Sequence, residues 1–139
     1  MSTADIARTT LSCIRIFNGA VGLFAAEKMA ASLGGELGED KRFVYPARMF
    51  GVRTIALGLD LLTLRADDAS AQHILRQAVV IHATDTAAAA YAGKRGELSP
   101  RAAKITTAIS AVNTVLAVVS LLGTSSPAVT RRATDARAH

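Results

Sequence analysis

Apolar residues fill four long segments of this chain, and short polar stretches separate the segments. They cover residues 2–33, 46–65, 71–92 and 99–123. Within them the β-branched residues are interleaved with Ala, and no alternation of apolar and polar positions supports a strand. The pattern therefore predicts an all-α protein with four long helices.

Residues at the segment boundaries support these limits. Ser2 with Asp5 predicts a capping box, and Pro46 suits the first residue of the second helix. Gly93 is expected to stop the third helix, and the Ser99-Pro100 pair provides a cap and a first helical residue for the fourth. In the first segment, residues 27–33 are expected to continue the apolar part and to lie along a membrane interface.

The fourth segment carries the strongest membrane signal. Residues 105–122 are uncharged over about the 18 positions that mark a spanning helix. The second and third segments each contain charged residues, which cost about 2.5–3.5 kcal/mol apiece at a helix centre. We expect these segments to insert together with their neighbours, giving a multi-pass protein of the inner (plasma) membrane in contact with the lipid bilayer. A soluble bundle would need a more polar outer face than the fourth segment offers.

The chain length of 139 residues fits one domain. We assign residues 1–123 to a four-helix membrane domain and residues 124–139, which are polar, to a disordered C-terminal tail. With four spans, six Lys and Arg residues fall on the side of the termini and eight on the other, a small difference that leans towards termini facing outward. The six are Arg8, Arg65, Arg76, Arg131, Arg132 and Arg137, and the eight are Lys28, Lys41, Arg42, Arg48, Lys94, Arg95, Arg101 and Lys104.

Composition argues against several other classes. The net charge of +5 is not arranged as a basic helix face, and aromatic residues make up only 4% of the chain, so nucleic acid is not an expected partner. His82 and Asp85 could reach one metal ion, but two ligands do not make a site. The glycines follow no nucleotide-binding spacing. We therefore expect no metal ion and no cofactor.

Charged residues inside the apolar segments are the most informative feature. Arg15, Arg53, Asp60 and Asp85 carry two positive and two negative charges, with His82 nearby. Charges in a membrane helix avoid lipid and meet in a shared interior. The predicted fold is accordingly a four-helix transmembrane bundle with its charged and polar residues facing the interior.

Helical spacing gathers these polar residues into stripes. On the second helix the stripe holds Met49, Arg53, Ala56, Asp60 and Thr63, whereas Gly51 and Gly58 lie on another face that a neighbouring backbone could approach. With about 1.5 Å of rise per residue, the estimated depth of each polar residue in the membrane predicts two layers of polar side chains. Arg53 is expected beside His82 and Asp85, and Arg15 beside Asp60 and Asn113.

Two functions fit this interior. The first is a structural or accessory membrane protein, held by buried Arg, Asp, His and Asn contacts, that acts in a homo-oligomer or a larger membrane complex. The second is a membrane-embedded hydrolase or isomerase acting on a lipophilic small molecule. Its catalytic candidates are Asp60 or Asp85 as base, Arg53 or Arg15 as electrophile and His82 as proton shuttle. The ligand-binding candidates are Arg15, Asn18, Ser110 and Asn113.

The segment from Arg48 to Leu59, RMFGVRTIALGL, resembles a recurring segment of small bacterial four-helix integral membrane proteins of unknown function. Residues 15–22 and 82–85 are similar to that group as well, so the resemblance covers about residues 8–122. It implies a four-span topology and carries no catalytic assignment.

Overall fold

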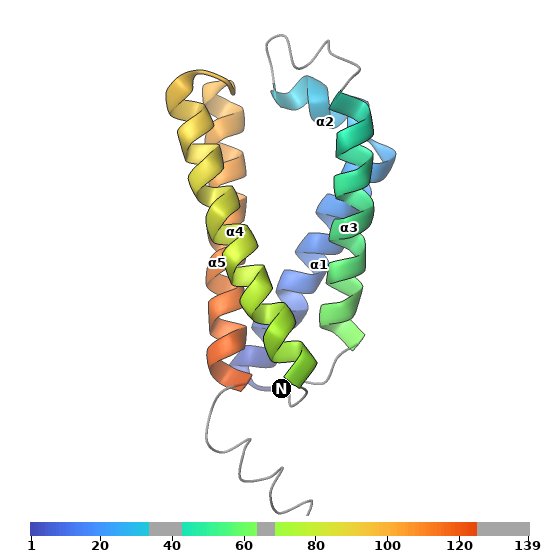
Figure 1. Cartoon of the computed structure of the whole chain (residues 1–139), viewed down its shortest axis with the longest axis vertical. Helices are drawn as coiled ribbons and strands as arrows, with labels where there is room; N and C mark the ends of the chain where they lie inside the picture. Colours follow the sequence, from blue (N-terminus) through green and yellow to red (C-terminus); the bar gives the residue numbers. More distant parts are fainter. Residues whose placement is uncertain (34–42, 64–68, 125–139) are drawn as a thin grey trace, which may run out of the picture.

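The computed structural model describes residues 1–33, 43–63 and 69–124, and these fold into five helices without a strand. In chain order they are α1 (Thr3–Phe24), α2 (Ala26–Leu33), α3 (Val44–Thr63), α4 (Ala69–Arg95) and α5 (Pro100–Thr124). The all-α class is confirmed for this part of the chain (Figure 1). The predicted tail lies outside the described residues, apart from Thr124.

The helix predicted over residues 2–33 is broken at Ala25, so the prediction of one continuous helix is wrong. The capping box at its start is confirmed, since the Asp5 N–H donates to Ser2 Oγ at 3.2 Å and the Ser2 N–H donates to Asp5 Oδ2 at 3.0 Å. At Ala25 the axis bends by 99°. This turn lets α2 bury Ala26 and Ala30, which lie four residues apart on one of its faces.

The helix predicted over residues 71–92 was expected to stop at Gly93, but it continues past this residue. α4 runs through Gly93 to Arg95, and Gly96 takes the left-handed conformation with φ of 73°. The Glu97 N–H donates to the Ala92 carbonyl at 3.0 Å and the Gly96 N–H donates to the Gly93 carbonyl at 3.3 Å, which is a Schellman motif. Gly93 instead allows close packing, because a Cβ there would lie 2.7 Å from the Cβ of Ala103.

α3 begins at Val44, two residues before the predicted start at Pro46. Pro46 still lies in the first turn, where its missing N–H leaves no helical hydrogen bond unmade. The predicted cap of the last helix is confirmed. Ser99 caps α5 by accepting the Ala102 N–H at 3.2 Å.

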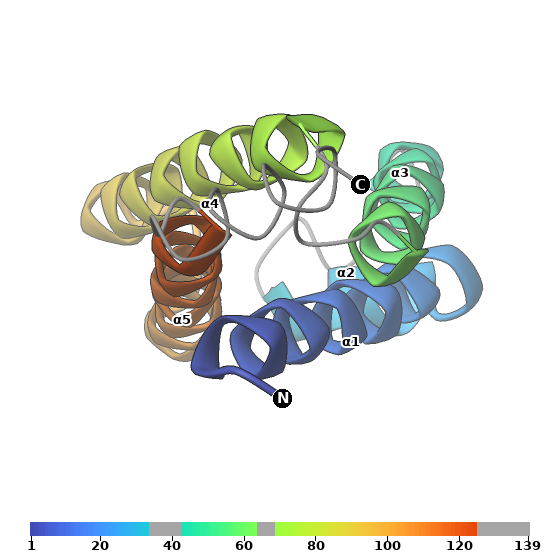
Figure 2. The same ribbon diagram turned by 90° about the horizontal axis from the view of Figure 1, so that it is seen from below.

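The long helices form two pairs, α1 with α3 and α4 with α5, and α1 also contacts α5. The pairs approach each other at the end where α1 begins and diverge towards the end where α2 lies (Figure 1). Seen along the bundle, the four long helices are arranged around a common axis (Figure 2).

Glycine backbones hold α1 against α3, as the sequence predicted for Gly51 and Gly58. A Cβ on Gly51 would lie 2.6 Å from the carbonyl oxygen of Gly19, and a Cβ on Gly58 would lie 2.8 Å from a side-chain carbon of Ile16. Because these contacts leave no room for a side chain, they fix which face of α3 turns inward.

Polar side chains lie in the interior beside an apolar cluster of Leu11, Leu61, Leu75, Ala78 and Ala117, and many large apolar side chains lie on the surface. Buried polar side chains include Arg15 and His82, which are 3% and 6% exposed, together with Ser110 and Asn113. Large apolar side chains cover the outer faces instead: Phe17, Val115 and Leu122 are each more than 60% exposed. Among the described helices, α5 alone is long and apolar enough to cross a membrane, and the bent pair of α1 and α2 passes only when taken together.

Candidate functional site

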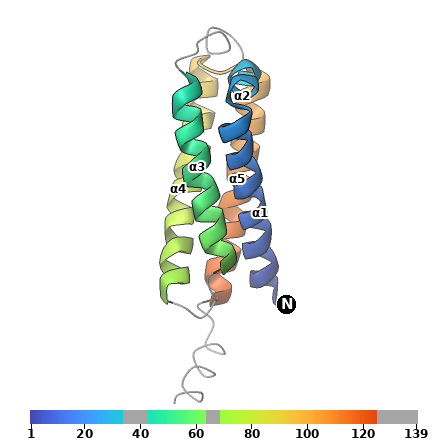
Figure 3. The ribbon, with the colours of Figure 1, turned by 90° about the vertical axis from the view of Figure 1, so that its right-hand side faces the viewer.

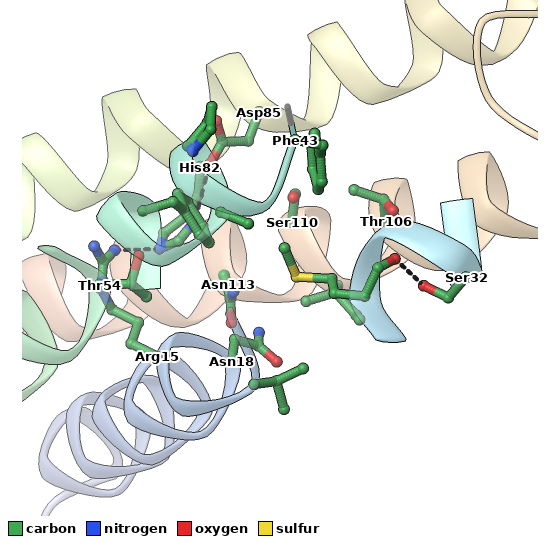
Figure 4. A pocket seen from close by; sticks show the side chains of 16 residues that line it. Arg15, Asn18, Ser32, Phe43, Thr54, His82, Asp85, Thr106, Ser110 and Asn113 are labelled. Atoms are coloured by element: carbon green, nitrogen blue, oxygen red, sulfur yellow. Dashed lines mark hydrogen bonds and ion pairs between the residues drawn. The ribbon is translucent and has the colours of Figure 1, made fainter. Parts of the chain in front are cut away.

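A cavity of about 530 Å³ lies between the two helix pairs. All five helices contribute to its wall, and α2 supplies Met29 and Ser32. One end is marked by Arg15 and Thr54 and the opposite end by Thr106 and Ser32 (Figure 4). Val21, Phe43, Phe50 and Ile109 add apolar wall. The volume falls within the range of about 300–1,000 Å³ that is typical of small-molecule sites.

Arg15 and His82 meet at this cavity and join α1 to α4. The Arg15 Nη1 atom lies 2.6 Å from His82 Nε2. A guanidinium can only donate, so the imidazole nitrogen that faces it must accept. This bond therefore requires a neutral His82 with its proton on Nδ1, a tautomer that we assign from the hydrogen-bond partner.

Asp85 extends this contact along α4. Its Oδ2 atom lies 3.8 Å from His82 Nδ1, on the side of the ring that carries the assigned proton. The side chain of Asp85 is half exposed, whereas that of His82 is buried. Arg15, His82 and Asp85 thus form a row of polar groups that ends at the cavity wall (Figure 4).

Two buried polar atoms near this row have no hydrogen-bond partner among the described residues. They are Nε of Arg15 and Oδ1 of Asn113. An unpaired buried polar atom costs about 1–3 kcal/mol, and such atoms call for a physical explanation. Both residues line the cavity, and although neither atom is itself open to it, a turn of either side chain would let a molecule in the cavity satisfy that atom.

Helical spacing positions these groups. Arg15 and Asn18 are three residues apart on α1, and His82 and Asp85 are three apart on α4. On α5, Thr106, Ser110 and Asn113 follow steps of four and three and all line the cavity. The four ligand-binding candidates, Arg15, Asn18, Ser110 and Asn113, are therefore brought together, and so are His82 and Asp85.

Arg53 and Asp60 do not join them, and the prediction that these charges face the interior is wrong. Both are exposed on α3. The polar stripe predicted for this helix exists, but the glycine face opposite to it packs against α1 and turns the stripe outward. Neither predicted layer forms, because Arg15 takes the place next to His82 that was predicted for Arg53.

Thr54 is a buried polar residue of the cavity that the sequence analysis missed. It follows Gly51 by three residues and precedes Gly58 by four, so it shares their inward face. The glycine spacing was the signal that could have identified it. The apolar wall residues Phe43, Phe50 and Met29 gave no such signal.

The site does not assemble a metal centre from the described residues, where no group of three or more His, Cys, Asp and Glu side chains converges. No protein-family model, curated protein or solved structure matches this chain. The chemistry of the site therefore has to be argued from its geometry alone.

Proposed function

We propose that this protein is a multi-pass bundle of the plasma membrane whose interior cavity binds a lipophilic small molecule with a polar head group. The membrane placement is supported by the large apolar side chains on the outer faces of the helices. Phe17, Val115 and Leu122 point away from the bundle, while Arg15, His82 and Asn113 are buried within it. A water-soluble bundle keeps mostly polar side chains on its outer faces.

The single observation that carries ligand binding is the cavity beside the Arg15 guanidinium and the Asn113 amide. Each group has a buried atom without a partner among the described residues. A ligand oxygen near Arg15 Nε would accept a charge-assisted hydrogen bond, and a ligand hydroxyl would donate to Asn113 Oδ1. The apolar body would lie against Val21, Phe50 and Ile109.

This proposal is tested with the full chain in lipid nanodiscs. We expect dodecanol, whose hydroxyl can accept from Arg15 and donate to Asn113, to raise the melting temperature, and dodecyltrimethylammonium, whose head can neither accept nor donate a hydrogen bond, to leave it unchanged. Asn113→Leu should abolish the shift. Ser120→Ala is the matched control, because Ser120 is an equally buried polar residue of α5 that bonds the Leu116 carbonyl and does not line the cavity.

An unchanged melting temperature with every amphiphile would contradict ligand binding. It would favour the structural or accessory role expected from the sequence, in which the buried polar contacts only hold the helices together. Membrane placement has its own test. A chain that is recovered as a monodisperse species in buffer without detergent would contradict it.

A hydrolase or isomerase is the second candidate function, and the row of Arg15, His82 and Asp85 favours it. Arg15 could polarise a ligand oxygen while Asp85, at the cavity wall, accepts a proton. In this case Asp85→Asn should retain the amphiphile-dependent melting shift but lose hydrolysis of a dodecyl ester, the molecule used as the probe for turnover. If that molecule is recovered unchanged after incubation with the wild-type protein, the catalytic role is contradicted.

A further inference from the structure

The outer face of α3 carries an uninterrupted exposed stripe. Seven exposed residues follow the spacing of a heptad repeat: Met49, Val52, Arg53, Ala56, Leu59, Asp60 and Thr63. α3 is visible over its whole length when the bundle is viewed from the side of α1 and α3 (Figure 3). Its opposite face, with Gly51 and Gly58, packs on α1, so this stripe is available for another molecule.

Two opposite charges lie within this stripe and form no ion pair with a described residue. Arg53 and Asp60 are seven residues apart, which places them on the same side of the helix and about 10 Å apart along its axis. The surrounding residues are mostly apolar, with Val52 and Leu59 about half exposed. In lipid, both charges would need a partner.

We propose that α3 pairs with α3 of a second copy of this chain in antiparallel orientation, so that Arg53 of each copy meets Asp60 of the other. The stripe is complementary to itself only in this orientation. Along one chain the stripe presents the cation Arg53 and then the anion Asp60. On a reversed second copy the order is the anion and then the cation, so each charge faces its opposite.

A parallel pair would bring like charges together. Arg53 would then face Arg53 of the other copy at the same depth, and Asp60 would face Asp60. Each opposite charge would be about two helical turns away, beyond the reach of a direct contact. The charge order therefore selects a reversed second copy, whereas an unrelated partner would have no reason to match it.

The antiparallel pair has a topological consequence, which rests on the membrane placement proposed above. Two copies must cross the bilayer in opposite directions. Orientation follows the bias of Lys and Arg between the two sides, and here the counts are six and eight. So small a difference permits insertion in both directions.

Cysteine cross-linking of the full chain tests the pairing. The single native cysteine, Cys13, is exposed and is replaced by Ser in all variants. Met49→Cys and Thr63→Cys chains, carrying tags of different size, are expressed together and oxidised in cell membranes. Antiparallel pairing predicts dimers between position 49 of one chain and position 63 of the other, at several times the yield of either like-with-like dimer.

Dimers joined 49 to 49 and 63 to 63 would overturn the proposal, and so would the absence of dimers. Val115→Cys, an exposed position on α5, is the matched control and should not cross-link. As a second measurement, Arg53→Asp or Asp60→Arg alone should lower the yield of the 49–63 dimer at least several-fold, and the double exchange should restore it. A double exchange that fails to restore the yield counts against the charge pairing.

The cross-linking pattern is read separately in the membrane and soluble fractions. A 49–63 dimer in the soluble fraction would retain the antiparallel pairing and contradict the membrane placement. A membrane-bound chain without that dimer would retain the membrane placement and contradict the antiparallel pairing. The two proposals can therefore fail independently.

Discussion

The Arg15 guanidinium on α1 donates to the His82 imidazole on α4 across 2.6 Å, between residues 67 positions apart in the sequence. This bond connects the two helix pairs at the wall of the cavity. It also determines the protonation state of the imidazole, because an arginine cannot accept a hydrogen bond in return.

Removal of the imidazole should destabilise the fold. In His82→Leu the buried Arg15 Nη1 loses its acceptor, and a buried charged donor left without a partner costs about 2–3 kcal/mol. His73→Leu is the matched control on the same helix, because His73 is exposed and its substitution should cost at most about 0.5 kcal/mol. Denaturant unfolding of both variants measures the difference. Equal losses would contradict the assigned bond.

Acid should weaken the same contact. An unfolded chain protonates its histidines near pH 6.5, whereas the folded chain can protonate His82 only by breaking the bond to Arg15 and bringing two cations together. The folded state therefore binds fewer protons, and its stability is present above pH 6.5 and falls as the pH drops below it. Melting curves between pH 5 and 8 measure the effect. His82→Gln, which keeps an acceptor without titrating, should lose this dependence.

The close contact between α1 and α3 should tolerate no added methyl group at Gly51. The new Cβ would lie 2.6 Å from the Gly19 carbonyl oxygen and 2.6 Å from the Leu23 nitrogen, and both are backbone atoms that cannot rotate away. We expect Gly51→Ala to cost about 1–3 kcal/mol. Gly22→Ala, with its nearest contact at 3.1 Å, should cost less. The order of the two melting temperatures checks this prediction, and the reverse order would contradict it.

Filling the cavity should separate binding from folding. Thr54→Leu places a larger apolar side chain on the cavity wall, so amphiphile binding should be lost while the melting temperature of the ligand-free protein stays within a few degrees of the wild type. Thr84→Leu makes the same change at an exposed position of α4 and should leave binding intact. Melting in nanodiscs with and without dodecanol reports both properties. Retained binding in Thr54→Leu would place the ligand elsewhere.

Most of this site could be predicted from polar residues at helical spacing within single segments of the sequence. Arg15, Asn18, His82, Asp85, Ser110 and Asn113 were all selected because polar residues at helical spacing within apolar segments need a shared interior, and all six line the cavity. Arg53 and Asp60 also lie in a polar stripe at helical spacing, but both are exposed. A polar stripe does not face inward where a glycine face of the same helix packs more closely against a neighbour.

The sequence by itself determined the helical class, the caps at Ser2 and Ser99 and the polar face of α5, because each depends on residues within one or two turns of each other. The tertiary structure decided which way α3 faces, where the first helix bends and which arginine contacts His82. These features depend on contacts between helices that are distant in the chain, and helical periodicity specifies a face without specifying its neighbour.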